Sequence, residues 1–62
     1  MKLTLRQLRL SKEISQEKMA NLLKIHRNTY VKLEENPGRI SIEQARTISN
    51  YFGVSVDDIF FN

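Results

Sequence analysis

Apolar residues recur at helical spacing through almost the whole chain, and very short connections separate the segments that they mark. The tightest connection consists of Lys24, Ile25 and His26, which lie between two amphipathic segments at 16–23 and 27–35. Two helices joined this closely cross at a steep angle, which is the geometry of a helix-turn-helix. The sequence therefore predicts an all-α fold built around this pair of helices.

Capping residues and breakers predict where five helices begin and end. Serine and threonine cap an N-terminus by accepting a backbone N–H, and a left-handed glycine stops a helix. Ser41 and Gln44 have the spacing of a capping box, and Pro37-Gly38 predicts a loop. Apolar and polar residues alternate in Val54-Ser55-Val56, but this stretch is too short to predict or exclude a strand. The predicted helices are Thr4 (as N-cap) to Lys12, Gln16 to Leu23 after Ser15, Arg27 to Glu35 after His26, a fourth from Ser41 to the stop at Gly53, and a short fifth capped by Ser55 and Asp58.

The apolar stripe of each helix predicts the core of a compact five-helix bundle. Leu3 and Leu10 fall on another face of the first helix, where they either form an exposed patch or pack under the C-terminal tail. The predicted inward residues are Leu5, Leu8 and Lys12 in the first helix, Met19, Ala20, Leu22 and Leu23 in the second, Thr29, Tyr30 and Leu33 in the third, Ile42, Ala45, Ile48, Ser49 and Phe52 in the fourth, and Val56, Ile59 and Phe60 in the fifth.

Length and composition exclude several classes of protein. Sixty-two residues predict one domain, residues 1–62, with a core of modest size. The absence of cysteine and the single histidine argue against disulfides, a metal site and any cofactor. No apolar run approaches the ~20 residues that span a bilayer, and no signal peptide is visible, so a cytoplasmic protein is expected. Glu34 and Glu35 face different ways on a helix and form no catalytic pair, so we expect no enzyme.

The charge is distributed unevenly along the chain. The net charge is +3, and residues 1–39 carry nine basic and four acidic side chains, against one basic and three acidic in residues 40–62. The first part is therefore +5 and the second −2. A basic segment favours a polyanionic partner such as nucleic acid.

One side of the third predicted helix carries groups that read base edges. At 100° per residue, Arg27, Asn28, Val31, Lys32 and Glu35 fall within an arc of about 140°. Arginine or lysine pairs with guanine, asparagine pairs with adenine, and valine contacts the thymine methyl group. Any amphipathic helix has a charged outer face, but this one is the second helix of a tight pair, which favours DNA reading.

The stretch Ile14-Ser15-Gln16-Glu17-Lys18-Met19-Ala20, continued in Leu33-Glu34-Glu35-Asn36, resembles the Cro/C1-type helix-turn-helix family, also called the XRE family. The likeness extends through 41–45 and 52–60, so it covers nearly the whole chain from Leu5 onward. The family includes phage Cro proteins, phage repressors and small bacterial regulators. The resemblance implies a bundle of the lambda-repressor-like DNA-binding type with its helix-turn-helix at residues 16–35.

The resemblance also implies roles for individual residues. Gln16 matches a position that donates to a DNA phosphate, Arg39 lies in a phosphate-holding loop, and His26 either contacts phosphate or only precedes the third helix. Arg9 and Glu34 match an ion pair that links the first helix to the third. The positions that match base-reading or groove-facing residues are Arg27, Asn28, Val31 and Lys32.

Four residues depart from the family pattern. Lys24 and Glu13 occupy positions that are often glycine, and Lys24 is expected to adopt a left-handed conformation. Glu35 places a carboxylate at the end of the reading helix. There it either accepts a hydrogen bond from the N4 amino group of cytosine or repels a DNA phosphate when the helix is wrongly placed. Tyr30 replaces a typical aliphatic residue and is predicted to be core with its hydroxyl near the surface.

The C-terminal tail carries three consecutive bulky apolar residues, Ile59, Phe60 and Phe61, which we predict to form a dimer interface. A helix cannot turn all three inward, and Phe60 is the one assigned to the core. The sequence thus predicts a homodimeric transcription regulator, a repressor, that binds a palindromic operator in double-stranded DNA. The alternative is an antitoxin-type protein that binds a toxin partner and regulates its own operon.

Overall fold

A computed structural model describes residues 4–60, apart from the side chain of Phe60. It contains five α-helices and one 3₁₀ turn, and no strand occurs within these residues. The predicted all-α five-helix bundle is therefore confirmed. The elements are α1 (Leu5–Ser11), α2 (Gln16–Leu23), α3 (Arg27–Glu35), η1 (Pro37–Arg39), α4 (Ile42–Phe52) and α5 (Val56–Phe60).

Side-chain caps explain where the helices begin. Ser41 Oγ accepts the backbone N–H of Gln44, and Gln44 Oε1 accepts that of Ser41, which completes the predicted capping box. Thr4 and Gln7 form a second box of the same kind at α1. Ser15 caps α2 through the N–H of Lys18 at 3.0 Å. These contacts satisfy backbone donors that have no partner inside the helix.

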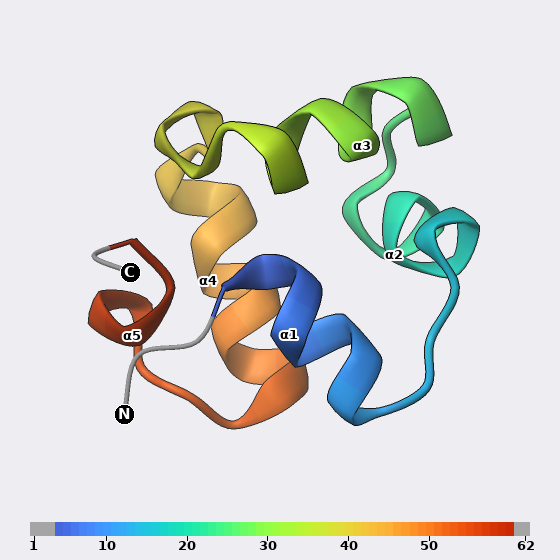
Figure 1. The fold of residues 1–62 in the computed structure, drawn as a ribbon. Helices are drawn as coiled ribbons and strands as arrows, with labels where there is room; N and C mark the ends of the chain where they lie inside the picture. Colours follow the sequence, from blue (N-terminus) through green and yellow to red (C-terminus); the bar gives the residue numbers. More distant parts are fainter. Residues whose placement is uncertain (1–3, 61–62) are drawn as a thin grey trace.

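The helices enclose a single cluster of buried apolar side chains, and α3 runs along one edge of the molecule with α2 beside its N-terminal end (Figure 1). Ala45 and Ile48 of α4 are fully buried, and so are Met19 of α2 and Tyr30 of α3. The loop residue Ile40 also enters the core. The buried residues are Leu5, Leu8, Ile14, Met19, Ala20, Tyr30, Leu33, Ile40, Ala45, Ile48 and Ile59.

Three residues predicted to face inward are exposed, each near a helix end. Lys12 is the C-cap of α1, and its ammonium group lies over the ring of Tyr51 at the surface. Ile42 is the first residue of α4 and is 64% exposed. Thr29, in the first turn of α3, is exposed as well. Helical spacing predicts which residues share the inner face of a helix, but it does not show how far along that face the neighbouring helices pack.

The turns on both sides of α2 use left-handed residues that are not glycine. Lys24 has φ 58° and ψ 43°, as predicted, and Glu13 has φ 53°. Backbone hydrogen bonds close both turns, from Ile25 N to Ala20 O at 3.0 Å and from Glu13 N to Leu10 O at 3.0 Å. Each left-handed side chain costs roughly 1–2 kcal/mol, which the surrounding packing offsets.

Candidate DNA interface

The turn between α2 and α3 sets the direction of α3. Ala20 is 2% exposed, and its small side chain lets the two helices approach closely. After the left-handed Lys24, Ile25 packs against the core and His26 precedes α3 with an extended backbone. His26 makes no side-chain cap, and its carbonyl accepts the N–H of Tyr30 at 3.0 Å. This is the tight, steeply crossing pair of a helix-turn-helix.

The outer side of α3 is free of packing contacts. Arg27, Asn28 and Lys32 are exposed, while Val31 is half-buried at the margin of this surface. Tyr30 and Leu33 on the opposite side are buried. The exposed side therefore offers two cations and one amide, which are the groups that pair with guanine and adenine in the major groove, together with the carboxylate of Glu35.

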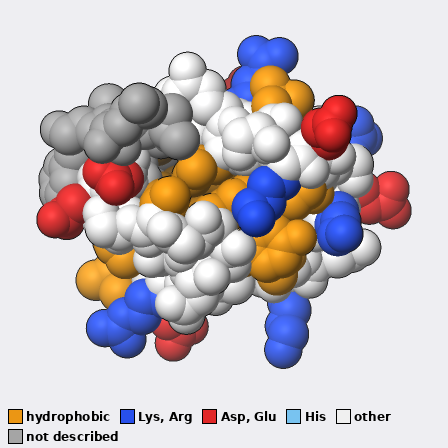
Figure 2. Space-filling model, turned by 90° about the horizontal axis from the view of Figure 1, so that it is seen from below, with side chains coloured by type: hydrophobic (Ala, Val, Ile, Leu, Met, Phe, Trp, Pro, Cys, Tyr) orange, Lys and Arg blue, Asp and Glu red, His pale blue; other side chains and the backbone are white. Residues whose placement is uncertain are grey.

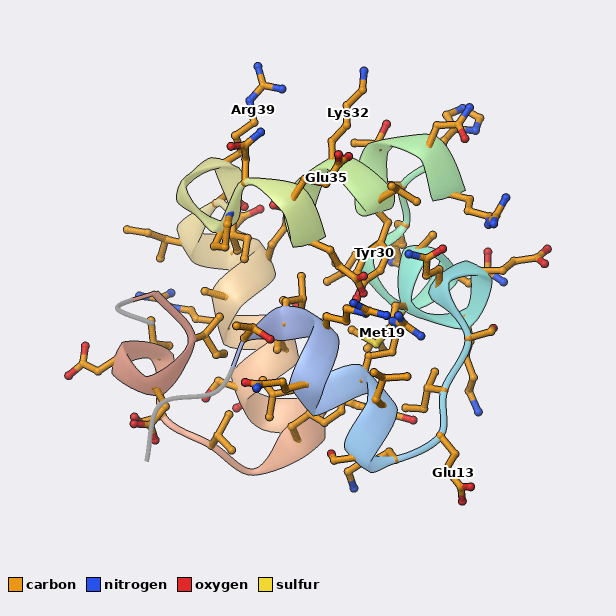
Figure 3. The ribbon with its side chains drawn as sticks, in the orientation of Figure 1. Glu13, Met19, Tyr30, Lys32, Glu35 and Arg39 are labelled. Carbon is orange, nitrogen blue, oxygen red and sulfur yellow. The ribbon has the colours of Figure 1, made fainter. Side chains whose placement is uncertain are left out.

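Arg39 extends in the same direction as Lys32, away from the body of the molecule (Figure 3). It ends the 3₁₀ turn η1, in which Arg39 N donates to Asn36 O at 2.9 Å and Ile40 N donates to Pro37 O at 3.1 Å. The predicted loop thus contains a short helical turn that holds Arg39 at the edge from which Lys32 projects. The side chain is exposed and lies beside the reading surface.

A polar depression lies beside α3, at the start of α2. It has a volume of about 600 Å³ and is lined by Arg6, Arg9, Gln16, Val31, Glu34 and Glu35. Arg6 is exposed, and it is not among the residues predicted to contact DNA. Its place beside Arg9 could have been predicted, because a spacing of three residues puts both side chains on one face of a helix.

The Glu34 carboxylate lies at the centre of a hydrogen-bond cluster that joins three helices. Arg9 Nε of α1 donates to Glu34 Oε2 at 2.6 Å, so the ion pair implied by the family resemblance is present. Gln16 Nε2 of α2 donates to Glu34 Oε1 at 3.2 Å, and the Tyr30 hydroxyl donates to Oε2 at 2.6 Å. Arg9 Nη1 also donates to the backbone carbonyl of Ile14 at 3.0 Å. The cluster fixes α3 against α1 and the start of α2.

This cluster differs from two expectations. Tyr30 is a core residue as predicted, and its hydroxyl is not exposed to solvent, because the residue is fully buried and the hydroxyl donates to Glu34. Gln16, expected to donate to a phosphate, is bonded to the same carboxylate. Its amide carries two N–H donors, so one protein contact leaves donor capacity for a phosphate.

Burial and hydrogen bonds shift the pKa values of the three ionisable residues in the cluster, Arg9, Tyr30 and Glu34. Burial alone raises the pKa of Glu34, but the hydrogen bonds from Arg9, Tyr30 and Gln16 outweigh it and hold this pKa below its usual value. The hydrogen bond to Glu34 raises the pKa of Arg9. Burial, and then the hydrogen bond to Glu34, raise the pKa of Tyr30. The pair is therefore charged and the tyrosine neutral at neutral pH.

Of the three tail residues predicted to form a dimer interface, the structure describes the side chain of Ile59 alone. Ile59 is fully buried, so its assignment to a dimer interface is wrong, and its place on the inner side of α5 is confirmed. The reason is that α5 turns Ile59 toward the core cluster. The side chain of Phe60 and all of Phe61 lie outside the described residues, as does Leu3. Leu10 is 51% exposed.

Residues 4–60 contain no group of three or more histidine, cysteine, aspartate or glutamate side chains placed to hold a metal ion. None of the helices in this range is both long and apolar enough to cross a bilayer.

Comparison with known proteins identifies the fold family. A family model described as helix-turn-helix matches residues 5–59, which is most of the chain and includes α1 to α4 complete. No curated protein and no solved structure matches the chain. The matched family is one of DNA-binding regulators that bind double-stranded DNA, and it is not typically enzymatic. With the tight α2–α3 turn and the exposed polar side of α3 in place, the chain belongs to the Cro/C1-type helix-turn-helix family, the XRE family of DNA-binding transcription regulators.

Proposed function

We propose that this regulator recognises a specific sequence in double-stranded DNA with α3 in the major groove, and that it represses transcription. The observation that carries the proposal is the exposure of Arg27, Asn28 and Lys32 on one side of α3, with Arg39 extending from the same edge (Figure 3). A helix held at this angle by a short turn enters the major groove with its N-terminal residues against base edges. A protein seated across a promoter represses by occupying the polymerase site.

Each exposed group has a separate task in this proposal. Asn28 pairs with adenine, Arg27 and Lys32 pair with guanine, and Val31 contacts a thymine methyl group. Gln16, His26 and Arg39 hold the phosphate backbone, aided by the free N–H groups at the start of α2. Selection of binding sites from a random DNA library tests the proposal, and one enriched motif is the expected result. A library that stays random after several rounds would contradict sequence-specific recognition.

Arg39→Ala is expected to weaken binding to all DNA sequences and to reduce the slope of log K against log salt by roughly 1, because one phosphate contact is lost. Lys12→Ala is the matched control. It removes one exposed cation next to Glu13, which lies at the opposite edge of the molecule from Arg39 (Figure 3). Fluorescence anisotropy at several salt concentrations measures both. An unchanged slope in the Arg39 variant would remove this residue from the phosphate contacts.

We further propose that the regulator binds a palindromic operator as a homodimer, through Phe61 in its C-terminal tail. One helix-turn-helix contacts one half-site, and a two-fold axis doubles the contacts. Two reading helices about 34 Å apart reach successive major grooves on one face of DNA. Since Ile59 is buried and Phe60 is assigned to the core, the contact falls to Phe61.

Phe61→Lys is expected to weaken the dimer by about 10–100-fold, since burial of a phenylalanine contributes about 1.5–3 kcal/mol. Asn62→Lys adds the same charge one residue later and should leave the dimer intact. Sedimentation velocity measures association, and circular dichroism shows that both variants stay folded. A wild type that is monomeric at high micromolar concentration would contradict the dimer itself.

A further inference from the structure

An apolar groove lies between the turn before α2, one side of α2 and the end of α4. It has a volume of about 360 Å³ and is lined by Ile14, Lys18, Met19, Asn21, Leu22 and Tyr51. Glu13, the neighbour of Ile14, lies at the edge of the molecule opposite Lys32 and Arg39 (Figure 3). The groove is therefore on the side away from the reading face and takes no part in the DNA contacts proposed above.

The groove has a buried apolar floor and accessible apolar walls. Ile14 and Met19 are buried, Leu22 is half-buried, and Tyr51 is 39% exposed. Seen from this side, hydrophobic side chains gather near the middle of the molecule with basic side chains beside them (Figure 2). The exposed surface of the lining is mostly apolar, and its polar groups are those of Lys18, Asn21 and Tyr51. A thioether such as that of Met19 adapts to side chains of different shapes.

The charge at the groove is positive. Lys18 forms part of the lining, and the Lys12 ammonium lies 5.9 Å from the ring centre of Tyr51 and 6.0 Å from that of Phe52. The lining contains no carboxylate. Within residues 4–60 the ion pair that the structure shows is Arg9–Glu34, and neither lysine has a carboxylate within ion-pair distance. The two lysines are therefore available to acidic groups of a ligand.

We propose that this groove binds an acidic amphipathic helix of a partner protein. Leucine or phenylalanine side chains at positions i, i+3, i+4 and i+7 of the partner helix enter the groove, and flanking aspartate or glutamate side chains pair with Lys12 and Lys18. A second copy of this chain is a poor occupant, because a two-fold contact through the groove brings the same lysines against each other. The proposal is independent of the DNA function, and the partner helix and DNA bind at the same time on opposite sides.

The test uses a fluorescein-labelled helical peptide with this leucine pattern and glutamates on both flanks, titrated with the full chain. We expect saturable binding that Lys18→Glu weakens at least tenfold. A peptide with lysines in place of the glutamates should bind the Lys18→Glu variant better than the wild type. Arg46→Glu is the matched control, since Arg46 is exposed on α4, outside the lining, and the change in net charge is the same.

Amide NMR shifts locate the binding site. Perturbations at Lys18, Leu22 and Tyr51 are the expected result. Perturbations centred on Lys32 and Arg39, or displacement of the peptide by DNA, would place it on the reading face and overturn the proposal. So would failure of the peptide to bind, or equal losses from Lys18→Glu and Arg46→Glu. Stronger recruitment to phosphatidylglycerol vesicles than to the peptide would also overturn it, in favour of a lipid surface.

Discussion

Replacing Glu34 with alanine is expected to destabilise the protein by about 3–5 kcal/mol, because the buried Arg9 guanidinium loses its counter-charge. The side chains of Arg9 and Glu34 are only 10% and 7% exposed, so water reaches the lost contact only from the depression that both residues line. A chain of 62 residues has a total stability of only about 3–9 kcal/mol. Urea unfolding followed by circular dichroism should therefore show a much lower unfolding midpoint for this variant than for the wild type.

Glu35→Ala is the matched control, because it removes the neighbouring, exposed carboxylate. This change should shift stability by no more than about 0.5 kcal/mol. The double variant Arg9→Met with Glu34→Leu should recover much of the loss, since it leaves no buried charge unpaired. Equal unfolding midpoints for the two alanine variants would show that the ion pair does not stabilise the fold.

The same carboxylate makes stability depend on pH. The pKa of Glu34 is lowered in the folded protein from the ordinary value of 4.5, so the folded state favours the ionised form. Its contribution is complete above that ordinary value and is lost as the pH falls through the lowered folded value. The difference in stability between wild type and the Glu34→Ala variant should therefore be constant near neutral pH and shrink below about pH 4.

Asn28→Ala is expected to cost about 1–3 kcal/mol on the selected DNA site and to relax preference at one base pair, because an amide that pairs with adenine is removed. Affinity for random DNA should hardly change, since that binding comes from phosphate contacts. Asn50→Ala is the control, because Asn50 is an exposed asparagine on α4. Fluorescence anisotropy titrations with the selected site and with random DNA measure the ratio of the two affinities. Equal losses on the two DNAs would remove Asn28 from base reading.

Local signals were enough to predict the helices and the exposed side of α3. Caps and breakers act within about four residues, so the limits of α2 and α3 and the left-handed Lys24 follow from neighbouring letters. The exposed side of α3 follows from its periodicity in the same way. The errors at Lys12, Thr29 and Ile42 come from helix ends, where coverage depends on which distant elements pack nearby.

Contacts between distant residues could not be predicted in this way. Gln16 and Glu34 are 18 positions apart, and only the packing of α2 on α3 brings the amide to the carboxylate. The buried hydroxyl of Tyr30 depends on the same carboxylate, which a helical wheel places at the margin of the core. The apolar groove combines residues from three separate segments, so no short stretch of sequence indicates it.

The left-handed residues Glu13 and Lys24 also bear on how readily this protein accepts mutations. Both side chains occupy backbone conformations in which glycine is unstrained, so the native state is less stable than its packing alone would allow. Glycine at either position relieves this strain and so stabilises the folded state. It also increases the conformational freedom of the unfolded chain, which offsets about 0.4–1 kcal/mol of that stabilisation. A single change at Glu13, far from the reading face, thus offers a modest stability margin against destabilising substitutions in α3. A lineage that first acquired that glycine would have more freedom to alter the reading residues and change its target sequence.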